Sequence, residues 1–376
     1  MRISWKMPVV AALIGAFVNF ATEAEVQRVY FGTYTNGASQ GIYVADFDSS
    51  SGAISNLRVA AKTENPSFLA KHPVLPVIYA VGEMVKEPDG DGGTVSAFRI
   101  EESGELTLIN RASSVGAGPC HVAVAPSGEH LAVANYGGGS VALLPIDAKG
   151  ALSKASAFFQ HVGSSVNKDR QGEPHAHSVT FDSSGKFLIV ADLGIDKLII
   201  YKYDAAAGSL TATDPAVLKP GAGPRHTKFH PTLPVLYSVN ELGNSVTAFS
   251  FDAASGATKE LQTISTLPSD SKGTNTTAEI RVHPSGRYVY ASNRGHDSIA
   301  VFAVDEQSGE LSATGQTPTG GRTPRNFNVD PGGKYLLAAN QNSDSVVTFA
   351  VDGKTGALKQ VGEPLSVPMP VCVFFP

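Results

Sequence analysis

One pattern of strands and turns recurs along this chain, and it limits the fold more than any other feature. Each copy opens with a short strand, passes through a turn into an apolar strand that ends in a polar residue, and then forms a further strand. Copies begin at residues 118, 223, 277 and 323. Strand-rich repeats of about 40–50 residues are typical of β-propeller blades, which pack radially around one axis. The repeat therefore predicts an all-β fold in which residues far apart in sequence meet at a central channel.

A constant spacing inside the repeat indicates the number of blades. In five copies a polar residue stands seven positions after the turn position. The turn positions are Gly128, Gly185, Leu233, Gly286 and Gly333, and the polar residues are Asn135, Asp192, Asn240, Asn293 and Asn340. A sixth copy starts at Asn65, and a seventh is divided between residues 28–54 and the final segment VPMPVCVFF. Pairing of the C-terminal strand with the N-terminal strands predicts a closed seven-bladed β-propeller of four-stranded antiparallel blades, without free sheet edges.

The first 24 residues differ from the rest of the chain. Arg2 and Lys6 form a basic start, residues 7–20 are apolar and uncharged, and small residues stand at the usual cleavage positions before residue 25. This pattern is typical of a secretory signal peptide, and its apolar stretch is too short for a comfortable membrane span. We therefore expect residues 25–376 to form one propeller domain that is periplasmic or secreted, with no stable membrane anchor after cleavage.

The bulk composition is informative about partners and about the cysteines. Hydrophobic residues make up 42% of the chain, which supports a large core, and the net charge is −5. Because there is no long block of like charge, we expect no nucleic-acid partner. Export would permit a disulfide, but Cys120 and Cys372 are expected to be two unpaired core residues, because inner strands rarely bring two cysteines within bonding range.

Two sets of equivalent positions are expected to meet at one end of the channel. The first set opens the inner strands, and the second set directly follows the shared polar residue. The first set is Ser67, Cys120, His177, Arg225, Ala278, Arg325 and Val371, and the second is Tyr136, Leu193, Glu241, Arg294 and Gln341. Because each inner strand runs antiparallel to the next strand, both sets lie at the same face. A structural repeat would keep one residue type at each position, so the change to charged residues predicts a functional site.

The candidate site residues fall into two groups. The candidate catalytic residues are His177, Arg225, Glu241 and Arg294, and the candidate substrate-binding residues are Arg325, His175, Asn135 and Asp192. The shared asparagines also suit a structural role, since Asn hydrogen-bonds locally in turns. His175 and His177 form an H-x-H pair, but no third ligand has the spacing of a zinc site, and the two arginines oppose a calcium ion. We expect no metal or other cofactor, and we expect His226 to be a core histidine.

Four blocks of the chain resemble one enzyme family. The blocks are GAGPRHTKFHP, VNELGNSV, RVHPSGRYVYASNR and TPRNFNVDPGGKYLLAANQ. Together they resemble the bacterial propeller-type 6-phosphogluconolactonases and the related fungal 3-carboxy-cis,cis-muconate lactonizing enzymes, from about residue 28 to the C-terminus. The resemblance implies a seven-bladed propeller. It places the family's active-site histidine at His177, its arginines at Arg225 and Arg294 and its glutamate at Glu241, and it assigns Arg325 to an anionic group.

These residues suit the hydrolysis of a small-molecule sugar lactone. We expect Glu241 to act as general base on water, Arg225 and Arg294 to stabilise the oxyanion, and His177 to protonate the leaving oxygen. The roles of Glu241 and His177 could also be exchanged. The predicted export separates the protein from cytoplasmic 6-phosphogluconolactone, so the lactone itself stays open. Two alternatives are a lactonizing lyase acting on a muconate-type dicarboxylate and a non-catalytic exported propeller that serves as a binding module.

Overall fold

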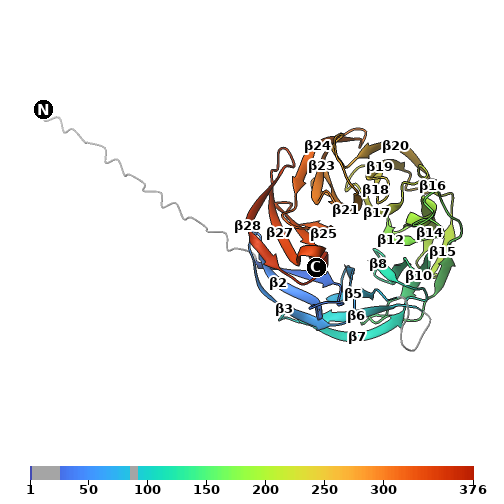
Figure 1. The fold of residues 1–376 in the computed structure, drawn as a ribbon. Coiled ribbons are helices and arrows are strands. Elements are labelled where there is room, and N and C mark those ends of the chain that lie inside the picture. Colours follow the sequence, from blue (N-terminus) through green and yellow to red (C-terminus); the bar gives the residue numbers. More distant parts are fainter. Residues whose placement is uncertain (2–25, 85–91) are drawn as a thin grey trace.

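The strands of the protein form seven antiparallel sheets around a central axis (Figure 1). The computed structural model describes Met1 and residues 26–84 and 92–376. The predicted signal peptide, residues 1–24, lies outside the described residues apart from Met1. Within the described ranges the helical segments are the short 3-10 turns η1 (Leu193–Ile195) and η2 (Gln341–Ser343), and no helix there could cross a membrane.

Each blade runs from an inner strand at the axis to an outer strand at the rim. One blade contains β4 (Leu69–Lys71), β5 (Val77–Gly82), β6 (Thr94–Ile100) and β7 (Leu106–Ser113), and the next contains β8 (Pro119–Val124), β9 (His130–Asn135), β10 (Ser140–Pro145) and β11 (Ala157–Gln160). The third contains β12 (Ala176–Phe181), β13 (Phe187–Asp192), β14 (Lys197–Asp204) and β15 (Ser209–Ala212), with the additional short strand β16 (Ala216–Val217) paired to β14.

The remaining blades follow the same order. The fourth contains β17 (Pro224–Phe229), β18 (Val235–Asn240), β19 (Ser245–Phe251) and β20 (Thr258–Ser265), and the fifth contains β21 (Thr276–Val282), β22 (Tyr288–Arg294), β23 (Ser298–Val304) and β24 (Leu311–Pro318). The sixth contains β25 (Pro324–Val329), β26 (Tyr335–Asn340), β27 (Ser345–Val351) and β28 (Leu358–Ser366), and the seventh contains β29 (Pro370–Phe374), β1 (Val26–Thr33), β2 (Gly41–Asp48) and β3 (Ile54–Lys62).

The hydrophobic core lies between neighbouring blades. The second strands β9, β13 and β18 are buried along their whole length. Because such a strand has a neighbouring sheet on each face, it is apolar on both faces, as in LAVA of β9 and FLIV of β13. The outer strand β20 instead contains only exposed and partly buried residues, and these alternate from Gln262 to Ser265 as expected for a strand with one solvent-exposed face.

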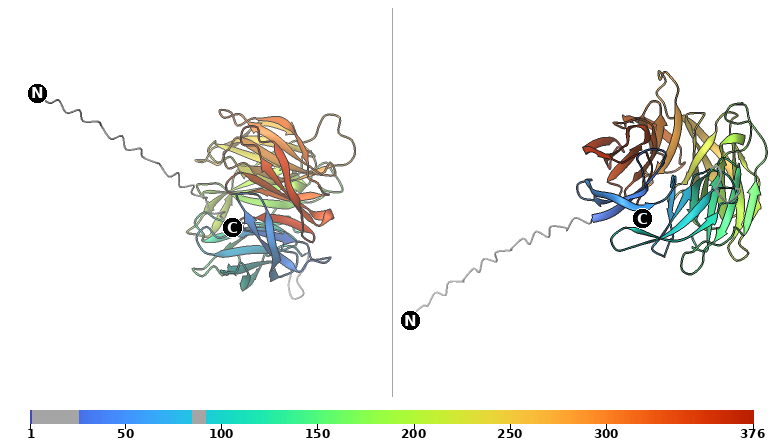
Figure 2. Two further views of the ribbon diagram at one scale, coloured as in Figure 1. Left: turned by 90° about the vertical axis from the view of Figure 1, so that its left-hand side faces the viewer. Right: turned by 60° about the horizontal axis from the view of Figure 1, so that its bottom comes forward.

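The two ends of the chain close the ring. Strand β29 pairs antiparallel with β1, with Phe31 opposite Val373. Figures 1 and 2 show the C-terminus beside the blue N-terminal strands. This pairing confirms the prediction that the split seventh blade joins the C-terminal strand to the N-terminal strands. The closed ring gives every blade a neighbour on both sides.

The inner strands carry a recurring irregularity that matters for the site. In six of the seven blades, the pairing between the inner strand and the second strand skips the first-set position. In β12 the skipped residue is His177, and in β17 it is Arg225. A β-bulge of this kind re-aims a side chain, and here it turns the skipped residues toward the channel.

The shared polar residue of the repeat stabilises the sheets. Asn135, Asn240 and Asn293 are at most 1% exposed. Their Nδ2 groups donate to the hydroxyl of the serine that opens the third strand of the same blade, at 3.2, 2.9 and 3.2 Å. The repeated asparagine therefore has the structural role that its uniformity suggested.

Candidate active site

The two predicted sets of residues meet at one end of the channel. A cavity of about 260 Å³ opens there, and its lining includes Glu83, Cys120, Tyr136, Arg170, His177, Glu241, Arg294 and Arg325. Arg225 lies directly beneath, in a small pocket that shares His177 and Arg325 with the cavity. The structure thus brings together all four candidate catalytic residues and Arg325, which come from the blades of β12, β17, β21 and β25.

Glu241 is the centre of a charge cluster. Its Oε1 accepts a hydrogen bond from Arg170 Nη2 at 2.7 Å, and its Oε2 lies 2.8 Å from Arg294 Nη2. Arg225 Nε is 2.9 Å from Oε2 but is not aimed at it well enough for a hydrogen bond, so this contact is an ion pair only. Burial alone would raise the pKa of Glu241, but Arg294 and Arg225 outweigh burial and hold it well below its usual range. Glu241 is therefore a carboxylate at any physiological pH.

His177 has the opposite character. It is 5% exposed, and burial together with the charge of Arg225 holds the pKa of its imidazole well below the usual value. The ring is therefore neutral at pH 7. Its Nδ1 lies 3.6 Å from the sulfur of Cys120, a free cysteine whose own pKa is raised by burial and by Glu83. Among the described residues, Nε2 of His177 has no hydrogen-bond partner, so one nitrogen of a neutral imidazole is available in the cavity.

Arg325 lines the cavity but, unlike Arg170 and Arg294, forms no ion pair with Glu241. Its guanidinium stacks over the ring of Tyr34 at 5.3 Å, and within residues 26–84 and 92–376 it makes no ion pair or hydrogen bond. Glu83 stands nearby, but its carboxylate accepts hydrogen bonds from the hydroxyls of Tyr34, at 3.0 and 3.1 Å, and of Ser67. Arg325 can therefore bind an anionic or partly negative oxygen without first breaking another contact.

Three residues of the site were not predicted. Glu83 and Tyr34 occupy the second-set positions of the β4 and β29 blades, where Gly82 and Thr33 replace the expected Asn. The seven-residue spacing could have identified Glu83. Leu75 holds the turn position of its copy, Gly82 lies seven residues later, and the next residue, Glu83, therefore belongs to the second set. Arg170 comes from the insertion of residues 161–174 before β12, from which no candidate site residue was predicted. It donates to Tyr136 at 3.1 Å as well as to Glu241.

The other predicted binding residues lie outside the cavity lining. Asn135 and Asp192 are fully buried, and Asp192 accepts from the backbone N of His175 at 2.8 Å and contacts His161 at 2.6 Å. His175 stacks on Tyr136 with ring centroids 4.5 Å apart, and its Nδ1 faces the Tyr136 carbonyl at 3.0 Å. These contacts fit residues that position the walls of the cavity, with His175 supporting Tyr136.

The donor set of the cavity suits anions. In the described parts of the chain, no three or more His, Cys, Asp or Glu side chains are grouped so that they could hold a metal ion. Four arginines and two glutamates surround the cavity and the pocket beneath it. The excess of guanidinium groups in a recessed site stabilises negative charge, and the neutral His177 can take up a proton.

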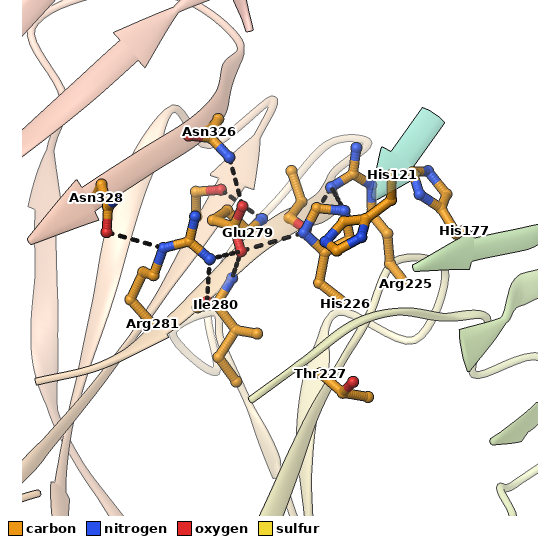
Figure 3. A network of polar contacts seen from close by, with 12 residues as sticks. His121, His177, Arg225, His226, Thr227, Glu279, Ile280, Arg281, Asn326 and Asn328 are labelled. Atoms are coloured by element: carbon orange, nitrogen blue, oxygen red, sulfur yellow. Dashed lines mark hydrogen bonds and ion pairs between the residues drawn. The ribbon is translucent and has the colours of Figure 1, made fainter. Parts of the chain in front are cut away.

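A second polar cluster fills the channel beneath the cavity (Figure 3). The buried Glu279 accepts from Arg281 Nη1 at 2.9 Å and from Asn326 Nδ2, and it lies 3.1 Å from His226 Nδ1. On its other side, His226 Nε2 is 3.2 Å from Arg225 Nη1. Because Arg225 can only donate, His226 carries its proton on Nδ1 and is neutral, and burial followed by Arg225 holds its pKa well below the usual value. This is the satisfied core histidine expected from the sequence.

The comparisons with known proteins agree with the seven-bladed fold. The family described as "Lactonase, 7-bladed beta-propeller" matches residues 28–375. The 6-phosphogluconolactonase of Bacillus subtilis is 39% identical over 293 residues, which cover 78% of this chain and 82% of that protein. The periplasmic gluconolactonase of Pseudomonas aeruginosa has a TM-score of 0.87 and 32% identity, covering 93% of this chain and 99% of the other. The chain therefore belongs to the family of seven-bladed β-propeller lactonases.

Proposed function

We propose that this protein hydrolyses a sugar lactone to the open-chain hydroxy acid in the cavity around Glu241. The observation that carries the proposal is the pairing of an available neutral imidazole, His177, with an arginine that no carboxylate holds, Arg325, in one cavity. Ester hydrolysis needs a group that accepts a proton from water and a group that stabilises the oxyanion. A cavity with both is suited to that reaction.

The proposed reaction uses His177 twice. His177 takes a proton from water while the water oxygen bonds to the lactone carbonyl carbon, and the carbonyl electrons move onto its oxygen. Arg325 stabilises that oxyanion within the positive potential of the arginine cluster. When the intermediate collapses, the bond from the carbonyl carbon to the ring oxygen breaks, and the proton on His177 passes to that oxygen. The carboxylic acid product then ionises and releases one proton.

Glu241 has a different role in this scheme from the one first expected. The sequence favoured Glu241 as the base and His177 as the acid, and left the exchange of roles open. The ion pairs with Arg225 and Arg294 support the exchange, because a carboxylate whose pKa lies far below neutrality is a weak base. We assign to Glu241 the positioning of the arginines.

The substrate class follows from the charge of the cavity and from the relatives. One relative is named a 6-phosphogluconolactonase and another a periplasmic gluconolactonase, so both phosphorylated and plain sugar lactones are candidates. The apolar segment of residues 7–20 supports export and hence a lactone that occurs outside the cytoplasm. Cell fractionation tests this location, and the mass of the mature protein shows whether the N-terminal segment has been cleaved. A full-length cytoplasmic protein would contradict export.

The reaction is tested by proton release. Glucono-1,5-lactone, its 6-phosphate and a muconolactone are titrated at constant pH with the purified protein, and the spontaneous rate is subtracted. We expect release with at least one sugar lactone, with and without a chelator. Consumption of cis,cis-muconate, added in a parallel assay, without sugar-lactone hydrolysis would favour the lyase, and no turnover of any compound would favour a binding module.

A further inference from the structure

The opposite end of the channel holds a second cavity. It has a volume of about 520 Å³ and is lined by residues near the C-terminal ends of the inner strands. The cavity around Glu241 is lined by residues at the beginning of those strands, such as Cys120, His177 and Arg325, and it shares no lining residue with the second cavity. The small pocket that holds Arg225 beneath it shares Phe68 with the second cavity. The buried layer around Glu279, drawn in Figure 3, contacts Arg225 through His226, and its Arg281 lines the second cavity.

Three cationic side chains line this second cavity: the exposed Lys71 of β4, and Lys228 and Arg281 from the neighbouring strands β17 and β21. Arg281 of β21 is held by Glu279, and its Nε donates to Asn328 Oδ1 of β25 at 3.1 Å. Lys228 of β17 is partly buried, yet within the part of the chain that the structure describes its ammonium group makes no hydrogen bond and no ion pair. Burial, followed by repulsion from Arg281, lowers the pKa of Lys228 to about 8. An anion placed between these two side chains would relieve that repulsion.

The carboxylates near the cavity are already engaged. Asp182 accepts from the backbone N of Lys186 at 2.8 Å and of Phe187 at 2.7 Å, and its other oxygen bonds Ser184. Glu279 belongs to the buried layer, where it binds Arg281. Neither carboxylate forms an ion pair with Lys228. The positive charge of Lys228 is therefore available to pair with an anionic ligand.

Much of the remaining lining is apolar, beside the polar side chains of His121, Thr180, Asp182, Ser183 and Asn328. Phe68, Ala70, Ala123 and Phe374 surround the cations, and Phe68 stacks on the neutral His121 with ring centroids 3.9 Å apart. Such a wall gains free energy by covering a hydrophobic group. The cavity thus joins an anion-binding end to an apolar end, which inorganic ions alone would not fill.

We propose that this second mouth binds a small organic anion, with a phosphate or carboxylate group held by Lys228 and Arg281 and an apolar body against Phe68 and Phe374. The proposal does not depend on the lactonase reaction, because its residues are separate from the cavity around Glu241. It predicts two anion sites at opposite ends of one channel.

The test is calorimetric titration of the full chain with phenyl phosphate. We expect Lys228→Met to weaken binding at the second mouth by about 10- to 100-fold, the usual effect of losing one charge-assisted hydrogen bond. Lys202→Met is the matched control, because Lys202 is an exposed lysine on β14. Lys228→Arg keeps the charge and should restore most of the affinity. Arg325→Met identifies any binding that belongs to the other cavity.

The companion probes separate the sources of affinity. Inorganic phosphate and benzoate should bind with the same dependence on Lys228, phosphate more weakly than phenyl phosphate because it lacks the apolar body. Benzyl alcohol, which is neutral, should not compete. Equal affinity of Lys228→Met and Lys202→Met, complete loss of binding in Arg325→Met, or absence of phenyl phosphate binding would each overturn the proposal. Melting temperatures of all variants show whether a loss reflects unfolding instead of a missing contact.

Discussion

The cavity around Glu241 and the buried layer around Glu279 use the same ingredients in different ways. Each contains a carboxylate, a neutral histidine and an arginine; His226, Glu279 and Arg281 of the buried layer lie on the inner strands β17 and β21, whereas Glu241 of the cavity follows the second strand β18. In the buried layer, Glu279 has partners on both oxygens and His226 has a partner on both nitrogens. In the cavity, among the described residues, His177 Nε2 and the guanidinium of Arg325 are left without hydrogen-bond partners.

The difference indicates which of the two clusters has side chains available to react with a ligand. A polar cluster whose members are all satisfied stabilises the channel and resists change. A cluster in which a base and a cation are free can act on a ligand that supplies the missing partners. Substitutions in the two clusters should therefore affect different measurements, with activity more sensitive in the cavity and stability more sensitive in the layer.

The largest expected effect is the loss of the proposed base. His177→Asn should lower kcat/KM for the lactone substrate by about 10²–10⁴-fold, the usual contribution of a positioned acid–base group. The measurement is proton release at constant pH, with circular dichroism to establish folding. His296→Asn, at an exposed histidine near the channel rim, is the control. Activity of His177→Asn within a few-fold of wild type would remove His177 from the mechanism.

The matching change in the buried layer should act on stability. Glu279→Gln keeps the shape but removes the charge that faces Arg281 and His226, and breaking a buried pair costs about 3–5 kcal/mol. Urea unfolding measures this loss, and the exposed Glu306→Gln serves as control. The decrease in kcat/KM should be smaller than for His177→Asn. A larger decrease would mean that the two clusters work as one unit.

Removal of the free arginine should have an intermediate effect on catalysis. Arg325→Met is expected to lower kcat/KM by about 10- to 100-fold, because one charge-assisted contact to the oxyanion or to an anionic substituent is lost. Arg325→Lys should recover only part of the activity, since an ammonium lacks the planar donor pair. Arg111→Met, at an exposed site on β7, should behave like wild type. If Arg325→Met also behaves like wild type, Arg325 has no part in the reaction.

Much of the fold could be predicted because every blade solves the same packing problem. The seven-residue spacing from the turn to the Asn recurs, so the blades could be aligned and the closure of β29 on β1 was expected. The aligned positions then identified His177, Arg225 and Glu241, since the bulges turn equivalent positions of each blade into the channel. Because the blades repeat, residues far apart in the sequence could be assigned to equivalent positions.

The remaining parts of the site depend on features that the repeat does not contain. Arg170 lies in an insertion that has no counterpart in the other blades, so no alignment could place it against Glu241. The side chain of Asp192 points into the protein and not into the cavity, which depends on a difference of one residue along the strand. The sequence also could not predict that Glu241 forms ion pairs with three arginines while Arg325 forms none, because these pairings depend on the distances between side chains of different blades.

The smallest expected effect concerns the pH dependence of stability. His121, His177 and His226 are buried, and the pKa of each lies well below its usual value, with burial as the first cause. In the unfolded chain they take up protons below about pH 6.5, while in the folded protein they stay neutral. Stability is therefore complete well above pH 6.5 and is lost as the pH falls, with a slope that approaches about 1.4 kcal/mol per pH unit for each histidine below about pH 5.5.

His121→Gln isolates one of these three contributions. Urea unfolding at pH 7.5, 6.5 and 5.5 should show a loss of stability from pH 7.5 to pH 5.5 that is smaller than in wild type by about 1.4 kcal/mol in total, whatever the substitution costs at pH 7.5. His296→Gln, at an exposed histidine, should leave the slope unchanged. An unchanged slope in His121→Gln would mean that His121 accepts a proton inside the channel. The buried layer would then be charged, and the contrast between a satisfied layer and a reactive cavity would not hold.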